Sequence, residues 1–203
     1  MKSSLNLMPG YRMNEYQLIL SPHEELRHKI SSVKKEFYEK FKIDGHVGSR
    51  PHLGLVSFAQ FEMNEDRIIN RLRTIAMGYN PFKVELKNFG SYPSHTIFIN
   101  VESKLQVQNL IKELKTAQQI LTLNKDNKAH FFDNPHIMIA GKLLPWQYEQ
   151  AWLEYNHMHF AGRFIASEML LLKRRQGDKP YLIAERFDFM NLPVSIKQGD
   201  LFI

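Results

Sequence analysis

Two short segments of the chain carry the residues best suited to chemistry, and they share one pattern. Each is a Pro-His step followed by an apolar, a variable and an apolar residue, at Arg50-Pro51-His52-Leu53-Gly54-Leu55 and Asn134-Pro135-His136-Ile137-Met138-Ile139. This alternation predicts half-buried strands. Because an imidazole has an ordinary pKa of about 6.5, it can serve as a base or as an acid near neutral pH. We therefore expect His52 and His136 to face each other across a cleft.

The elements expected to carry these histidines form a strand-helix-strand-helix-strand series that occurs twice. Apolar periodicity, a capping box at Ser21-Pro22-His23-Glu24 and breaks at glycine and proline define the elements. The first series is predicted as a strand at 15–20, a helix with apolar positions 26, 30, 33, 37 and 41, the first Pro-His strand, a helix over 64–79 and a strand at 82–89. The second is predicted as a strand at 96–101, a helix with apolar positions between 107 and 121, the second Pro-His strand, a helix opened by Pro145, and a hairpin that pairs residues 164–173 with 181–189.

The spacing within the two series indicates an internal duplication. The interval from Glu15 to His52 is nearly as long as the interval from Thr96 to His136, and self-similarity at a fixed spacing is typical of repeated units. No linker or low-complexity segment separates the halves. We therefore predict an α+β fold in one bilobal domain, residues 1–203, in which repeats at approximately 15–90 and 95–190 place mainly antiparallel sheets around a central cleft.

Composition narrows the class of partner. The formal net charge of +6 favours an anionic partner such as a phosphate ester or nucleic acid. The chain has no cysteine, which excludes disulfides and thiolate chemistry and fits a reducing compartment. No apolar segment has the length of a signal peptide or of a membrane span, so we expect a cytoplasmic protein without membrane contact. No feature of the sequence indicates an oligomeric state.

The chain resembles the 2H phosphoesterase superfamily, which includes the 2′-5′ RNA ligase-like cyclic phosphodiesterases, from roughly Tyr16 to Phe189. The resemblance rests on the two Pro-His segments and on the order of the elements around them. It implies phosphodiester cleavage without metal or cofactor, with His52 and His136 as the catalytic acid–base pair. A nucleotide or RNA phosphate ester is the substrate that it implies.

The two segments depart from the family pattern His-x-Thr/Ser-x at its third position. The family hydroxyl lies on the same strand face as the histidine and donates to a non-bridging phosphate oxygen. Here the corresponding residues are Gly54, which has no side chain, and Met138, whose sulfur cannot donate. Ser57 is five positions beyond His52, which on a regular strand places it on the opposite face. The family's phosphate contacts are therefore missing from both segments.

Other residues would have to bind phosphate in this site. The candidates are Lys142, which has the strand parity of His136, together with His95, Arg50 and backbone amides. Gly54 and Met138 remain candidate substrate contacts through backbone and apolar atoms.

Three functions stay open on this sequence: a working phosphodiesterase, a module that binds a nucleotide or RNA end with little turnover, and a hydrolase that acts on a different ester. His157 and His159 lie near the end of a predicted helix without a third ligand at recognisable spacing, so we predict no metal site.

Overall fold

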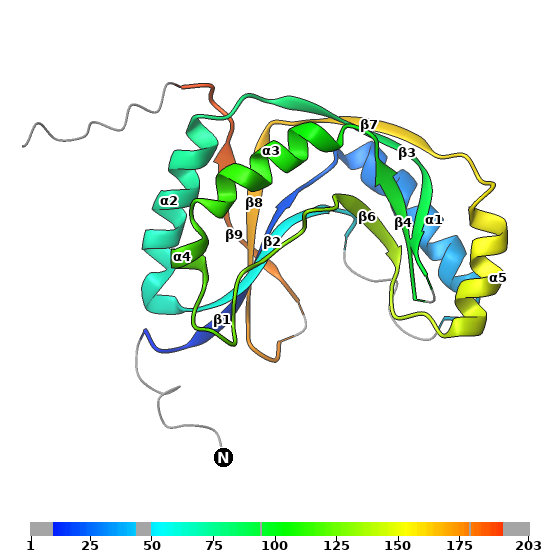
Figure 1. Ribbon diagram of the computed structural model, residues 1–203, viewed down its shortest axis with the longest axis horizontal. Coiled ribbons are helices and arrows are strands. Elements are labelled where there is room, and N and C mark those ends of the chain that lie inside the picture. The colour runs from blue at the N-terminus through cyan, green and yellow to red at the C-terminus, as the bar shows by residue number, and fades with distance from the viewer. Residues whose placement is uncertain (1–9, 44–49, 94, 179, 193–203) are drawn as a thin grey trace, which may run out of the picture.

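The computed structural model describes residues 10–43, 50–93, 95–178 and 180–192, and its ribbon has the shape of an arch (Figure 1). The elements in chain order are β1 Met13–Leu20, α1 Glu24–Lys40, β2 Leu53–Phe61, a 3-10 helix Glu62–Asn64, α2 Glu65–Met77, β3 Phe82–Tyr92, β4 Thr96–Val101, α3 Lys104–Lys115, α4 Gln118–Leu121, β5 His130–Phe131, β6 His136–Ala140, α5 Pro145–Tyr155, β7 Ala161–Ala166, β8 Glu168–Arg175 and β9 Leu182–Asp188. The predicted α+β class with antiparallel sheets is confirmed.

The strands form two antiparallel sheets that exchange strands between the predicted repeats. One sheet has the order β5-β2-β1-β8-β9 and the other the order β6-β4-β3-β7. Strand β3, from the first repeat, pairs with β4 of the second, and β8, from the second repeat, pairs with β1 of the first. The segments 15–90 and 95–190 therefore do not each form a separate sheet.

The predicted strand over 164–173 is in fact two strands that belong to different sheets. The extended segment is interrupted at Ser167. Before it, β7 pairs with β3, and after it, β8 pairs with β1 and β9. Apolar residues on both sides of Ser167, at 164–166 and 169–172, made the segment resemble one strand, although the two runs belong to different sheets.

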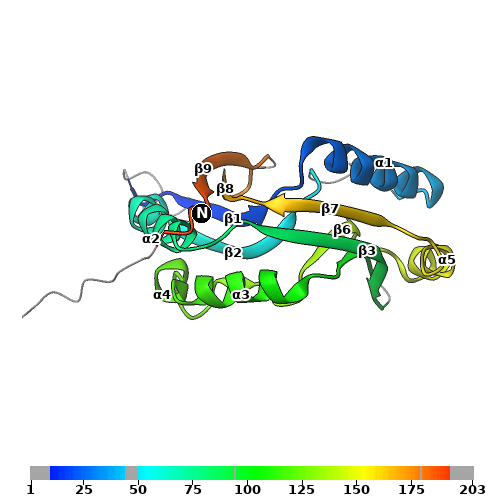
Figure 2. The same cartoon turned by 90° about the horizontal axis from the view of Figure 1, so that it is seen from above.

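The helices also cross between the two sheets. Helix α1 follows β1 of the first sheet but packs on β6 and β7 of the second, whereas α4 packs on β2 of the first and α3 on both β2 and β3. Figure 2 shows α1 and α3 on opposite sides of the strand layer. The apolar stripe of α1 is buried at Leu26, Ile30 and Phe37. The core therefore joins residues that are distant in sequence.

Each Pro-His strand contains the same irregularity at the same place. Leu18 pairs with Val56 and Ile19 with Gly54, so Leu55 is an extra residue in β2. In the other sheet, Ile97 pairs with Ala140 and Phe98 with Met138, so Ile139 is the extra residue in β6. A bulge of this kind shifts the alternation of side chains by one residue. Its recurrence three residues after each histidine supports the predicted duplication.

Candidate active site

His52 precedes β2, and hydrogen bonds occupy both of its ring nitrogens. Its Nδ1 lies 2.8 Å from the carbonyl oxygen of Arg50, which can only accept, so Nδ1 carries the proton. The neutral ring then has a lone pair on Nε2, which lies 3.2 Å from the amide nitrogen of Gln17 on β1. Gln17 thus donates to the nitrogen that would act as a base.

His136, the first residue of β6, repeats the backbone bond but has aromatic neighbours. Its Nδ1–H donates to the carbonyl oxygen of Asn134 at 2.8 Å. The imidazole packs against the ring of Phe98, with centroids 4.5 Å apart, and meets the ring of Tyr92 edge to face at 5.5 Å. The Asn134 amide donates to the Tyr92 hydroxyl at 2.7 Å. Tyr92 therefore supports the ring of His136 and the residue whose carbonyl orients it.

Both imidazoles favour the neutral form in the unliganded protein. Burial lowers the pKa of His52, the bond to the Arg50 carbonyl opposes this, and the positive charge of Lys34 adds to the lowering. Burial also lowers the pKa of His136, against the bond to Asn134. A neutral ring with Nδ1 protonated has Nε2 available to accept a proton.

The two imidazoles line one cavity of about 260 Å³ between β2 and β6. The predicted site residues that the structure brings to it are His52, His136, Gly54, Met138 and Arg50. The other described residues of the lining are Gln17, Lys34, Tyr38, Pro51, Phe132, Asn134 and Ile139. The arrangement places two imidazoles, which can accept or donate a proton, in one half-open cavity.

Two predicted substrate contacts lie outside this lining. Strand β6 ends at Ala140, and Lys142 follows in a turn with a φ of 57° and an exposed side chain, so strand parity does not extend to it. His95 is also exposed, and its Nδ1 lies 2.9 Å from the Pro93 carbonyl oxygen. The ring of His95 stacks on the ring of Tyr92, which in turn contacts the ring of His136.

The two hydroxyl positions of the family pattern hold apolar groups. A Cβ atom on Gly54 would lie 3.0 Å from the ring of Phe132, which is held beside β2 by a bond from its amide to the Leu55 carbonyl. Met138 is 51% exposed at the other wall of the cavity. In the described residues, an aromatic ring thus covers the first position and a thioether stands at the second.

The bulge corrects the predicted orientation of Ser57. Because Leu55 is an extra residue, the alternation reverses, and Ser57 pairs directly with Gln17. Directly paired residues share a face of the sheet, and the side chain of Gln17 contacts His52 on that face. Ser57 therefore lies on the same face as His52, although it does not line the cavity.

The residues that sequence reasoning missed come mostly from other elements. Lys34 is 5% exposed on α1, and the signal for it was its spacing from Ile30 and Phe37, which places it on the apolar face. The predicted stripe had Val33 there instead, and Val33 is only partly buried. Gln17 and Phe132 gave no signal, because their roles depend on which strands become neighbours.

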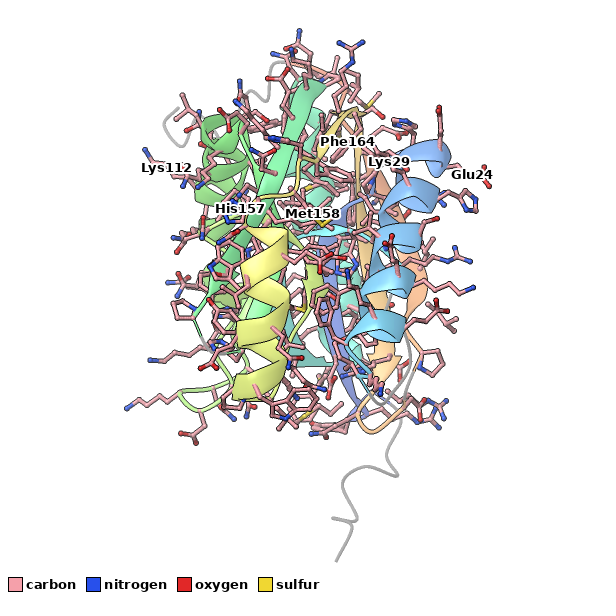
Figure 3. The ribbon with its side chains drawn as sticks, turned by 90° about the vertical axis from the view of Figure 1, so that its right-hand side faces the viewer. Glu24, Lys29, Lys112, His157, Met158 and Phe164 are labelled. Atoms are coloured by element: carbon pink, nitrogen blue, oxygen red, sulfur yellow. The ribbon has the colours of Figure 1, made fainter. Side chains whose placement is uncertain are left out.

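The remaining histidines give no evidence of a metal centre. Within the ranges that the structure describes, no three His, Cys, Asp or Glu side chains are grouped so as to hold a metal ion. His157 and His159 are exposed, and Figure 3 shows His157 at the end of α5 on the outer side of the molecule. In those same ranges, no helix is long and apolar enough to cross a membrane.

Comparisons with known proteins bear on the family and the fold. The family model described as the 2′-5′ RNA ligase superfamily matches residues 21–178, which is most of the chain. A search of curated proteins finds no match. Among solved structures, E. coli LigT in apo form is similar with a TM-score of 0.62 and 14% identity, over 87% of this chain and 98% of LigT. E. coli LigT complexed with 3′-AMP is similar with a TM-score of 0.60 and 14% identity, over 88% and 98%. A crystal structure of a phosphoesterase gives 0.62 and 14%, over 87% and 98%. At this identity the likeness shows a shared fold.

Proposed function

The chain belongs to the 2′-5′ RNA ligase superfamily, and on that premise we propose that it is a metal-free phosphodiesterase of the 2H type. Its substrate is a 2′,3′-cyclic phosphate, a 2′-5′ linked nucleotide or a related RNA ester. The observation that carries the proposal is that two imidazoles line one cavity, each with Nδ1 bonded to the carbonyl two residues before it. The complexes of E. coli LigT with 3′-AMP and with phosphate support a nucleotide or phosphate as the ligand.

In this proposal His52 is the general base. Its imidazole is half-buried, and both this burial and the positive charge of Lys34 disfavour its protonation. Nε2 of His52 takes a proton from the attacking water as the new bond to phosphorus forms, and it gives that proton back when the reaction reverses. The Gln17 amide now donates to this nitrogen, so it has to be displaced by the nucleophile.

His136 is then the general acid. The faces of aromatic rings attract cations, and the rings of Phe98 and Tyr92 lie against this imidazole. A bound phosphate anion also favours the protonated form, which raises the pKa that burial has lowered. Nε2–H of His136 donates its proton to the leaving oxygen as the phosphorus–oxygen bond breaks. The two rings exchange roles when the reaction reverses.

One observation favours a second function, a module that binds a nucleotide or RNA end with little turnover. Neither Gly54 nor Met138 has the hydroxyl that the family pattern places beside each histidine. Loss of one preorganised donor typically costs about 10²–10³ in rate. Such a module keeps the cavity for its ligand while it lacks most of the transition-state stabilisation.

A substrate panel with histidine variants separates these functions. Purified protein is assayed on 2′,3′-cyclic nucleotides and on 2′-5′ linked dinucleotides. His52→Ala and His136→Ala are each expected to lower kcat by about 10²–10⁴, the usual contribution of a positioned acid or base. His157→Ala, at an exposed histidine just after α5, is the matched control and should leave kcat unchanged.

The panel also defines failure. Absence of turnover by the wild-type protein on every ester would reject the phosphodiesterase. If nucleotides still perturb the NMR signals of both cavity histidines in that case, the binding module is supported.

A further inference from the structure

Gln17 on β1 brings a side-chain amide to the nitrogen of His52 that the proposed reaction uses. The amide nitrogen of Gln17 lies 3.2 Å from Nε2 of His52, and both side chains line the cavity between β2 and β6. Because Nδ1 of His52 donates to the Arg50 carbonyl, Nε2 of the neutral ring can only accept a hydrogen bond. The neutral ring therefore requires that the N–H end of the amide, and not its oxygen, faces it.

Strand pairing holds Gln17 beside the position at which the first histidine segment lacks its hydroxyl. Gln17 is two residues before Ile19 on β1, and Ile19 pairs directly with Gly54 on β2. Residues two apart on a strand share a face, and so do directly paired residues. Gln17 and Gly54 therefore lie on the same face of the first sheet, the face on which His52 lies.

The corresponding residue of the second repeat is placed differently. Met138 pairs with Phe98, and Thr96 is two residues before Phe98 on β4. Thr96 is 6% exposed and does not belong to the described lining of the cavity. The side-chain donor on the neighbouring strand is therefore a feature of the His52 side.

The amide of Gln17 is a suitable donor to an oxyanion. Phe132 covers Gly54, so a hydroxyl could stand at that strand position only if the ring moved. A side-chain amide has two N–H donors, and glutamine and asparagine side chains serve as donors in oxyanion holes. Among the described lining residues of the cavity, no carboxylate would repel an anion.

The bond from Gln17 cannot persist while His52 acts as a base. Once Nε2 binds the nucleophile, and again once it has taken the proton, its lone pair is no longer free to accept from the amide. A donor that loses its partner in a half-buried site costs free energy unless it finds another acceptor. A phosphate bound between the two imidazoles supplies such an acceptor next to the amide.

We propose that the Gln17 amide, once displaced from His52 by the nucleophile, donates to a non-bridging oxygen of a phosphate group in this cavity and so replaces the missing hydroxyl of the first histidine segment. This inference rests on the proposed function and deepens it, because it assigns a contact to the phosphate. The contact comes from β1 rather than from the strand that follows the histidine.

Phosphate binding by matched variants tests the inference. The dissociation constant of inorganic phosphate is measured by calorimetry for the wild type, Gln17→Met and Ser57→Ala. Gln17→Met keeps an unbranched side chain without N–H groups, and it is expected to weaken binding about 10- to 100-fold, as for loss of a hydrogen bond to a charged group. Ser57, the cross-strand partner of Gln17, lies on the same face but outside the cavity lining, so Ser57→Ala should bind phosphate as the wild type does.

A second measurement excludes a purely structural effect. The pKa of His52, followed by NMR without phosphate, should rise in Gln17→Met, because the donor that stabilises the neutral ring is removed. It should rise further in Gln17→Glu, whose carboxylate favours the protonated ring, and this variant should also bind phosphate more weakly than the wild type. Gln17→Glu serves as the test variant if the methionine variant does not fold. Unchanged phosphate binding in a folded Gln17 variant, or no phosphate binding by the wild type, would overturn the inference.

The outcomes separate this inference from the proposed function. Weakened phosphate binding in Gln17→Met, together with no hydrolysis by the wild type, supports the phosphate contact and rejects the enzyme. Hydrolysis whose KM and kcat are unchanged in Gln17→Met supports the enzyme and rejects the phosphate contact.

Discussion

The two histidine strands have the same backbone arrangement but different surroundings. In both, Nδ1 of the imidazole is bonded to the carbonyl two residues earlier, and an extra residue occurs three positions later. Around His52 lie the amide of Gln17 and the charge of Lys34, whereas around His136 lie the rings of Phe98 and Tyr92. The duplication therefore gives equivalent positions to two groups, and the side chains supplied by other elements make their chemistry different.

The prediction with the largest expected effect tests whether the extra residues of the two bulges contribute equally to the free energy of unfolding. Leu55 and Ile139 are both fully buried extra residues. Replacing either with alanine should lower the free energy of unfolding by about 2–5 kcal/mol, because each substitution leaves a cavity in the core. Denaturant titration measures this. Leu105→Ala, at an exposed helical position, is the control and should change stability by less than about 0.5 kcal/mol. A large difference between the two core variants would break the comparison.

The next prediction restores a hydroxyl to each strand. Met138→Thr should raise kcat on a 2′,3′-cyclic nucleotide by about 10- to 100-fold, because Met138 is half exposed and the new hydroxyl has room to donate. Gly54→Thr alone should give no such gain, since its Cβ would lie 3.0 Å from the ring of Phe132. Gly54→Thr combined with Phe132→Ala should recover part of it. Equal gains from the two single variants would show that Phe132 does not separate the two sites.

The side chains that position the imidazoles of His52 and His136 differ, and Tyr92→Phe tests the one beside His136. This change removes the hydroxyl that accepts from Asn134 but keeps the aromatic ring against His136. We expect a stability loss of about 0.5–1.5 kcal/mol and a fall in kcat of less than about tenfold. The NMR signal of His136 should shift while that of His52 stays in place. An equal shift of both signals would contradict the separate supports.

The smallest expected effect is on how the free energy of unfolding depends on pH. Both imidazoles have a pKa in the folded protein below the ordinary value of 6.5, so the unfolded chain binds more protons. The stability that the two neutral imidazoles contribute is therefore fully present above pH 6.5. It is lost as the pH falls below 6.5 and through their pKa values in the folded protein. His52→Gln should reduce this dependence more than His136→Gln, because the charge of Lys34 adds to the lowering of the pKa by burial at His52 and not at His136. Urea unfolding at pH 7.5, 6.5 and 5.5 measures it, and a steeper loss in either variant would contradict the assignment.

Sequence patterns predicted most of the local elements and the histidine pair, because these depend on periodicity and on repeated motifs, but they missed β5 and the break at Ser167. They did not predict the partners of those elements. Exchange of β3 and β8 between the sheets, the position of Phe132 over Gly54 and the bond from Gln17 to His52 all depend on strand pairing. Lys142 was misplaced because β6 ends before it. Lys34 was overlooked although its helical spacing marked it, because an apolar position was expected there.

The exchange of β3 and β8 has a consequence for a severed chain. A break between Tyr92 and Thr96 would leave two fragments that pair through their strands, β3 of the first with β4 and β7 of the second, and β1 of the first with β8 of the second. In each fragment alone, these strands would have unpaired backbone N–H and C=O groups along one edge, and such an edge readily pairs with a strand of another chain. When the two fragments are mixed, we therefore expect them to associate, and His52 and His136 would line one cavity again only in that complex.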